Sequence, residues 1–238
     1  MEQSGTSTLL QGAVQDLASG VVSALRGGDH ARAAAPAVAD GEVAAVRVLG
    51  ADALLPSTLL HTSPLPDELA VFRKAVEAYP PRADAAPTVV WSHWGMRRTL
   101  RRLDPSFVDG ATHVDGTTHG QEAEPDAGEL DSASGQSLTH QLAVLAALAL
   151  PGEDCAVARV AARRPLDVAR GFVRAVRRRE WRQAAGAGRW LTLLDGVPDT
   201  LGLETGLDFV ELMGGEDPLV ALQVQAARLA RTGTGAFP

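Results

Sequence analysis

The chain has 238 residues, 45% of them hydrophobic but only 4% aromatic, which favours a core of Ala, Val and Leu in closely packed helices over a wide sheet. Its formal net charge of −7 argues against binding to bulk nucleic acid or to an anionic membrane, and no apolar run is long enough to span a bilayer. The single cysteine, Cys155, excludes an intrachain disulfide and is typical of a reducing cytoplasm.

The first 80 residues are expected to form a helical N-terminal part. Apolar side chains recur at helical spacing from Leu10 to Leu25, and Gly27-Gly28 ends this helix. Three further helices are predicted over residues 29–38, 51–60 and 66–79.

Three short segments are predicted as the strands of a small sheet. The run Thr88 to Trp91 has the clearest strand character, because Thr and Val are β-branched and Trp is aromatic. The other two strands are predicted over residues 42–49 and 155–162. A helix from about Trp94 to Leu103 is expected to follow the first of them.

Residues 104–136 are predicted to form a long central acidic loop. The segment has no apolar period and is rich in Gly, Asp, Thr and Ser. Loops longer than about 12–15 residues usually carry a function or are disordered. The nearly all-apolar helix predicted next, over residues 137–150, should lie at the centre of the fold.

The remaining chain is predicted to be largely helical, with helices from Pro165 to Arg182, over residues 200–213 and from Pro218 onward. The expected fold class is therefore α+β and mainly helical. We expect a single domain over residues 1–238, with a small sheet and the long acidic loop.

Charge is sorted into blocks in the second half of the chain. From Leu103 to Ala158 there are ten acidic residues and no Lys or Arg. From Arg159 to Arg189 there are ten arginines and only two acids, and from Trp190 to Ala227 there are seven acids and no basic residue. Such blocks can steer a partner or pair with each other across the fold.

Ser92 and His93 are the candidate catalytic residues. If Thr88 to Trp91 is a strand, both follow its C-terminal end, at the edge where α/β sheets bind ligands and next to a helix N-terminus. Ser92 is then a candidate nucleophile or phosphate contact, and His93 a candidate general base. Val90 and Trp94 stand where a nucleophile elbow needs small residues, so the alternative is a Ser92 that only caps the helix.

His113, Asp115 and His119 in the acidic loop are candidate metal ligands, because imidazole and carboxylate groups bind zinc and iron. Their spacing matches no established metal motif, so we favour a solvated loop and expect no metal. The chain has no Walker loop, G-x-G-x-x-G or C-x-x-C motif, and we expect no cofactor.

Two arginine clusters are candidate sites for an anion or a protein partner. Arg97 and Arg101 follow Trp94, and Arg174 and Arg178 share a row on the helix predicted from Pro165. Basic rows next to aromatic residues can bind phosphate groups or acidic partners. The alternative is that they pair with the acidic blocks of the same chain, which we favour because those blocks flank them in sequence.

A second possibility for such pairing lies nearer the C-terminus. Glu204, Asp208 and Glu211 share one face of the helix predicted over residues 200–213, where they are expected to pair with arginines or to face solvent. A metal site is the alternative for this set.

These patterns favour a soluble, cytoplasmic interaction or accessory protein with segregated acidic and basic faces. A bacterial source is expected, because Lys74 is the only lysine beside 21 arginines, as in GC-rich genomes. The expected partner is a protein or a small anionic ligand, not nucleic acid and not a membrane. The first alternative is a hydrolase or transferase built around Ser92, His93 and the 104–136 loop, and the second is a nucleotide or nucleic-acid binder that uses the arginine-rich helix.

Overall fold

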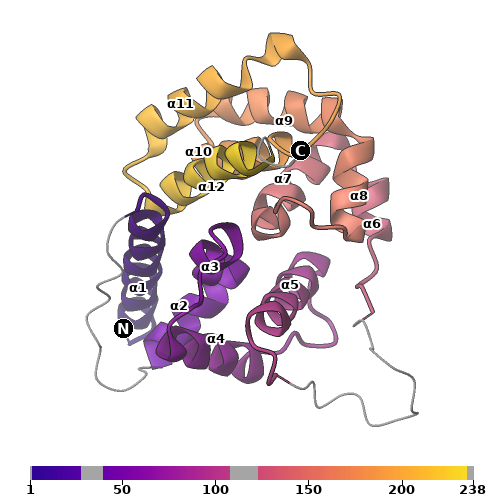
Figure 1. Ribbon diagram of the computed structural model, residues 1–238. Coiled ribbons are helices and arrows are strands. Elements are labelled where there is room, and N and C mark those ends of the chain that lie inside the picture. Colours follow the sequence, from indigo (N-terminus) through magenta and orange to yellow (C-terminus); the bar gives the residue numbers. More distant parts are fainter. Residues whose placement is uncertain (1, 28–39, 108–122, 235–238) are drawn as a thin grey trace.

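The computed structural model describes residues 2–27, 40–107 and 123–234, and all regular structure in these ranges is helical (Figure 1). The first two ranges contain α1 (Glu2–Leu25), α2 (Asp40–Leu49), η1 (Gly50–Leu54), α3 (Leu55–Leu59), α4 (Pro66–Ala78) and α5 (Pro87–Leu103). The third contains α6 (Gly128–Ser132), α7 (Gly135–Val144), η2 (Ala146–Leu148), α8 (Ala156–Arg163), α9 (Pro165–Arg178), α10 (Trp181–Leu191), η3 (Asp199–Leu201), α11 (Leu203–Gly214) and α12 (Pro218–Thr234).

The predicted small sheet, and with it the α+β fold class, is wrong, because the described ranges contain no strand. The segment predicted as a strand over residues 42–49 lies in α2, and residues 88–91 lie in the first turns of α5. Residues 156–162 lie in α8, so the third predicted strand is helical too. The protein is an all-helical fold.

The packing explains why these segments are helices. In α2 the buried apolar residues include Val43, Val46 and Leu49, which recur every three residues instead of alternating. In α5, Pro87 occupies the first helical position, where its fixed φ angle favours the helix and its missing N–H costs nothing. Burial against neighbouring helices therefore overrides the strand propensity of the Val-rich runs.

The predicted 104–136 loop is shorter than expected at its C-terminal end. Residues 128–132 form α6, and α7 begins at Gly135, where the Ser134 side chain caps the helix by accepting a hydrogen bond from the backbone N–H of Ser137. Residues 108–122 lie outside the described ranges, as does the helix predicted over residues 29–38.

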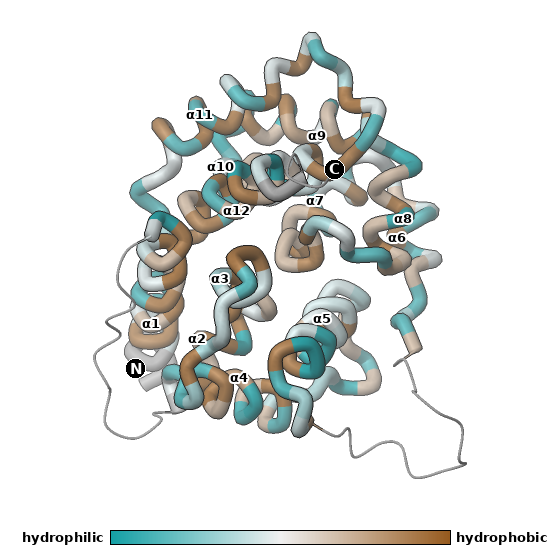
Figure 2. The backbone as a smooth tube through the Cα atoms, in the orientation of Figure 1, coloured by the Kyte–Doolittle hydropathy of each residue, from teal (hydrophilic) through white to brown (hydrophobic). Residues whose placement is uncertain are grey.

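One hydrophobic core lies among the N-terminal helices. Phe72 of α4, and Met96 and Leu100 of α5, are fully buried there together with apolar side chains of α1 and α2. Leu222 of α12 reaches into the same core. Apolar and polar residues succeed each other along these helices (Figure 2), so each helix has one side that faces the core.

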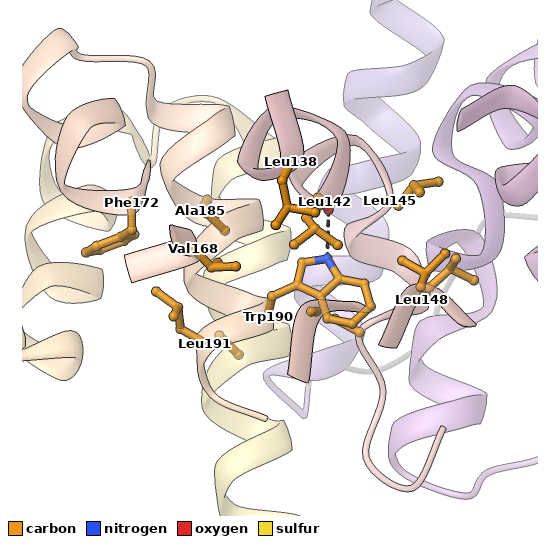
Figure 3. Close-up of a cluster of buried hydrophobic side chains, with 14 of the residues drawn as sticks. Leu138, Leu142, Leu145, Leu148, Val168, Phe172, Ala185, Trp190 and Leu191 are labelled. Atoms are coloured by element: carbon orange, nitrogen blue, oxygen red, sulfur yellow. Dashed lines mark hydrogen bonds between the residues drawn. The ribbon is translucent and has the colours of Figure 1, made fainter. Parts of the chain in front are cut away.

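A second core lies among the C-terminal helices. Trp190 of α10 is 1% exposed, and its indole Nε1 donates a hydrogen bond of 2.7 Å to the backbone carbonyl of Leu142 in α7 (Figure 3). Leu138 and Phe172 lie in the same cluster, from α7 and α9. The hydrogen bond satisfies the polar end of a large buried side chain, as buried Trp requires.

Helix α10 approaches its neighbours closely because its middle is built from small residues. A Cβ atom at Gly186 would lie 2.8 Å from the carbonyl oxygen of Ala143 in α7, and one at Gly188 would lie 2.6 Å from Leu207 in α11. The Gly- and Ala-rich run of α10 therefore allows close packing against α7 and α11.

The two cores meet along α12 and at a buried polar cluster. Helix α12 packs against both α1 and α10 (Figure 1). Beside it, Arg189 of α10 lies against Asp52 of η1, and Gln223 of α12 contacts both side chains. No helix within the described ranges is long and apolar enough to cross a membrane.

Candidate functional site

The arginine block is neutralised at both of its ends by acidic residues of the same chain. Near its start, ion pairs join Arg159 to Glu124 and Asp154, Arg163 to Asp131, and Arg164 to Asp167. Near its end, Arg182 pairs with Asp217 and Arg189 with Asp52. Glu124, Asp131 and Asp154 belong to the acidic block before the arginines and Asp217 to the block after them, so both flanking blocks pair with arginines in the fold.

Four arginines in the middle of the block have no such partner among the described residues, and three of them lie within α9. Arg170, Arg174 and Arg177 of α9 make no ion pair or side-chain hydrogen bond with any residue that the structure describes. They are spaced at i, i+4 and i+7, which places them on one side of the helix. A guanidinium group stays charged at any physiological pH, so this side of α9 carries three uncompensated positive charges.

The local sequence explains why α9 presents these arginines outward. The helix begins at Pro165, with Asp167 in its first turn, and Val168 and Phe172 are buried on its inner side. It ends at Arg178, and the next residue, Arg179, adopts a left-handed conformation with φ 59°. The apolar side of α9 therefore packs into the core, and the arginines lie on the outer side of the helix.

A groove runs along the arginine side of α9. We call it the α9 groove, and its volume is about 550 Å³. Its floor is apolar, with Leu166, Ala169 and Val173 from α9, and its opposite wall is formed by Pro198, Thr200 and Leu201 at η3. The guanidinium-bearing residues along it are Arg170, Arg174 and Arg177. No acidic residue is among the described side chains that line the groove.

Of the two arginines of α9 that were predicted as site residues from the sequence, one lines the α9 groove and the other does not. Arg174 lines the α9 groove and is half-buried there, whereas Arg178 lies 4.0 Å from Glu180 and does not line it. Arg170 and Arg177, which also line the groove, were not predicted as site residues from the sequence. The signal for both was their spacing of one helical turn from Arg174.

The other candidate residues lie together on α5. Ser92 is half-buried, and His93 is 7% exposed. His93, Arg97 and Arg101 follow one another at four-residue intervals along one side of the helix. The structure adds Arg47 from α2, whose Nη1 donates to the Ser92 hydroxyl over 3.5 Å and whose Nε donates to the carbonyl of Tyr79. Sequence reasoning missed Arg47 because it assigned α2 to a strand.

This α5 cluster is positively charged and partly shielded from solvent. Burial lowers the pKa values of Arg47, Arg97 and Arg101. Burial, followed by the positive charges of Arg47 and Arg97, lowers the pKa of His93 to about 4, so the imidazole is neutral at pH 7. The Nδ1 atom of His93 is buried without a hydrogen-bond partner among the described residues.

The contacts of Ser92 and His93 bear on their proposed chemistry. A serine nucleophile needs a base within hydrogen-bond reach, and the group that Ser92 contacts is the guanidinium of Arg47, which cannot accept a proton. The hydrogen bond instead places the hydroxyl beside a positive charge, which suits an anion contact. A catalytic role for the two residues stays a prediction.

The predicted metal ligands His113, Asp115 and His119 lie outside the described residues. In the ranges that the structure does describe, no group of three or more His, Cys, Asp or Glu side chains could hold a metal ion.

The three acidic residues of α11 are paired with arginines, as expected from their spacing. Glu204 lies near Arg231, Asp208 pairs with Arg228, and Glu211 pairs with Arg228 and Arg26.

A second groove, of about 530 Å³, lies between α7 and α10. Val144 and Trp181 line it, and the Trp181 ring packs edge-on against Phe209 of α11 at 6.0 Å between centroids. On α11, the apolar side chains of Leu212 and Met213 are 80% and 49% exposed. In contrast to the α9 groove, the charged residues that line this groove have opposite signs, Glu180 being negative and Arg182 positive.

Comparison with known proteins finds no matching family model, no similar curated protein and no similar solved structure. The α9 groove and the α5 cluster therefore have to be interpreted from their own chemistry.

Proposed function

We propose that this is a non-catalytic, cytoplasmic interaction protein that binds an acidic partner through the α9 groove. The observation that carries the proposal is the contrast within one block of arginines. The arginines at both ends of the block have carboxylate partners in the fold, whereas Arg170, Arg174 and Arg177 have none among the described residues.

Electrostatics supports an anionic occupant. Three guanidinium groups on successive turns of one helix repel each other, and no carboxylate is among the described residues that line the groove. A bound carboxylate would remove the repulsion and form charge-assisted, bidentate hydrogen bonds, which are about twice as strong as neutral ones. Because Arg170 and Arg177 are exposed to solvent, we expect the interaction to weaken as the salt concentration rises.

The enzyme alternative rests on fewer observations. The one described hydrogen bond of the Ser92 hydroxyl is to Arg47, and no described metal cluster supplies another activating group. The cytoplasmic location fits the lone Cys155, which is fully buried and free.

Binding of a fluorescein-labelled eight-residue oligoglutamate, followed by fluorescence anisotropy, tests the proposal. Wild-type protein should bind it, with an affinity that falls at least several-fold between low and moderate salt. The triple variant Arg170→Gln, Arg174→Gln and Arg177→Gln should lose this binding while its circular dichroism spectrum stays helical.

Arg179→Gln is the matched control. Arg179 is an exposed arginine with no described ion pair, it directly follows α9, and it does not line the groove. Its replacement should leave the affinity unchanged. Equal binding by the triple variant and the wild type would refute the α9 groove as the site.

A further inference from the structure

We infer that the natural occupant of the α9 groove is an acidic amphipathic helix of a partner protein, with carboxylates at i, i+4 and i+7 and an apolar side chain between them. This inference rests on the proposed function and names the class of partner. Three features of the groove support it: the spacing of its arginines, its apolar floor and the absence of aromatic side chains among its described lining residues.

The spacing of the arginines matches a helix. Arg170 and Arg177 are seven residues apart on α9, so their backbones are separated by about 10 Å along the helix axis, with Arg174 between them. A single carboxylate has two oxygens, so it can form a bidentate pair with only one of these guanidinium groups at a time. Engaging all three charges therefore requires an occupant that carries several anionic groups over the same length.

A helical occupant fits this length better than an extended one. Side chains at i, i+4 and i+7 of a second helix also lie on one side and span about 10 Å. In an extended chain, side chains on the same side are about 6.6 Å apart, so three of them span about 13 Å. This is longer than the distance of about 10 Å that separates the first and last arginine, so three carboxylates of an extended chain would not all lie opposite a guanidinium group. A helix laid along α9 can thus present one carboxylate to each guanidinium.

The floor of the groove adds an apolar requirement. Leu166 is 50% exposed, and Val173 lies between the levels of Arg170 and Arg174 on the same side of α9. Pro198 and Leu201 face them from the opposite wall. An apolar side chain on the acidic face of the partner helix would cover this surface and exclude water from the ion pairs, which strengthens them.

Nucleic acid fits the groove less well. Proteins that bind single strands stack bases on aromatic side chains, and the described residues that line the groove include none. The net charge of −7 also opposes the approach of a long polyanion, whereas a short acidic helix is repelled much less.

Two 15-residue peptides with the same composition test the inference. The matched peptide carries Glu at i, i+4 and i+7 with Leu at i+3, in an alanine-rich background. The scrambled peptide carries the same residues with Glu at i, i+2 and i+5, which spreads the charges around the helix. Circular dichroism is used to match their helix contents, and anisotropy gives both affinities.

The matched peptide should bind at least about tenfold more tightly than the scrambled one. Arg174→Gln should reduce its affinity to the level of the scrambled peptide, and Arg179→Gln should leave it unchanged. Leu166→Asp, which places a negative charge on the groove floor, should also abolish the preference for the matched peptide.

The alternative outcomes separate the inference from the proposed function. Equal binding of both peptides, or competition by millimolar inorganic phosphate alone, would overturn the helical partner while the acidic-partner function stands. Tighter binding of a 15-residue oligothymidylate than of either peptide would replace the protein partner with a nucleic acid. No binding of either peptide or of oligoglutamate would overturn both proposals.

Discussion

Arg189 and Asp52 form a fully buried ion pair across 137 residues of sequence. The Nη1 group of Arg189 donates to both carboxylate oxygens of Asp52, at 2.8 and 3.0 Å, and the two side chains are 0% and 3% exposed. Gln223 bridges the pair, and the Nε of Arg189 donates to the carbonyl of Ala149. The pair joins η1 of the N-terminal part to α10 of the C-terminal part.

Removal of one partner should therefore destabilise the whole molecule. Asp52→Ala leaves the Arg189 charge buried without a counter-ion, so we expect the free energy of unfolding to fall by about 3–5 kcal/mol in urea titrations. The double variant Asp52→Leu with Arg189→Met should recover much of this loss, because it removes both charges together.

The matched control for this prediction is the exposed pair of Arg163 and Asp131, whose side chains are 56% and 54% exposed. Arg163→Ala should cost less than about 1 kcal/mol. Equal losses at the buried and the exposed pair would contradict the role assigned to burial.

A second prediction concerns the close packing of α10. Gly186→Ala adds a methyl group 2.8 Å from a backbone oxygen of α7, so we expect it to destabilise the protein by about 1–3 kcal/mol. Gly20→Ala in α1 is the matched control, because nothing lies within 4 Å of its added Cβ, and it should stabilise the protein by about 0.5–1 kcal/mol. Chemical denaturation of both variants decides the matter, and a neutral Gly186→Ala would show that α7 and α10 are not in close contact.

A third prediction concerns the pH dependence of stability. The pKa of His93 is about 4 in the folded protein and near its ordinary 6.5 in the unfolded chain, so unfolding takes up a proton between these values. The contribution of His93 to stability is complete above about pH 6.5 and is lost as the pH falls toward 4.

Comparison of wild type with His93→Asn isolates this contribution from that of the carboxylates. The wild type should lose more of its unfolding free energy than the variant between pH 7 and pH 5. An NMR titration should place the midpoint for the His93 imidazole well below 6. A midpoint near 6.5 would contradict the burial and the nearby positive charges described for this side chain.

The sequence allowed part of this fold to be predicted, chiefly where a proline or glycine marks a helix boundary. The helices that begin at Pro66, Pro165 and Pro218 were predicted at their observed starting points. Pro87 is also the first residue of a helix, but the Val-rich run after it was interpreted as a strand, because propensity does not include the packing partners that the fold supplies.

Less of the candidate site than of the fold could be predicted from the sequence. Arg174 could be named because arginines recur along the helix, and pairing with flanking acidic blocks was favoured for the whole row. The opposite wall, Pro198 to Leu201, could not be placed, since its position beside α9 depends on the tertiary contacts of α10 and α11. Which arginines stay without a partner is likewise a property of the folded chain and not of the spacing alone.

The most direct test of the central claim is the melting temperature of the triple variant Arg170→Gln, Arg174→Gln and Arg177→Gln, measured with and without the matched acidic peptide. If the three arginines are reserved for a partner, their removal relieves mutual repulsion, so the free variant should melt at the same temperature as wild type or higher. The peptide should raise the melting temperature of the wild type alone, because only a folded state with an intact site binds it. A fall of several degrees in the free variant, or an equal rise with peptide in both proteins, would contradict the account.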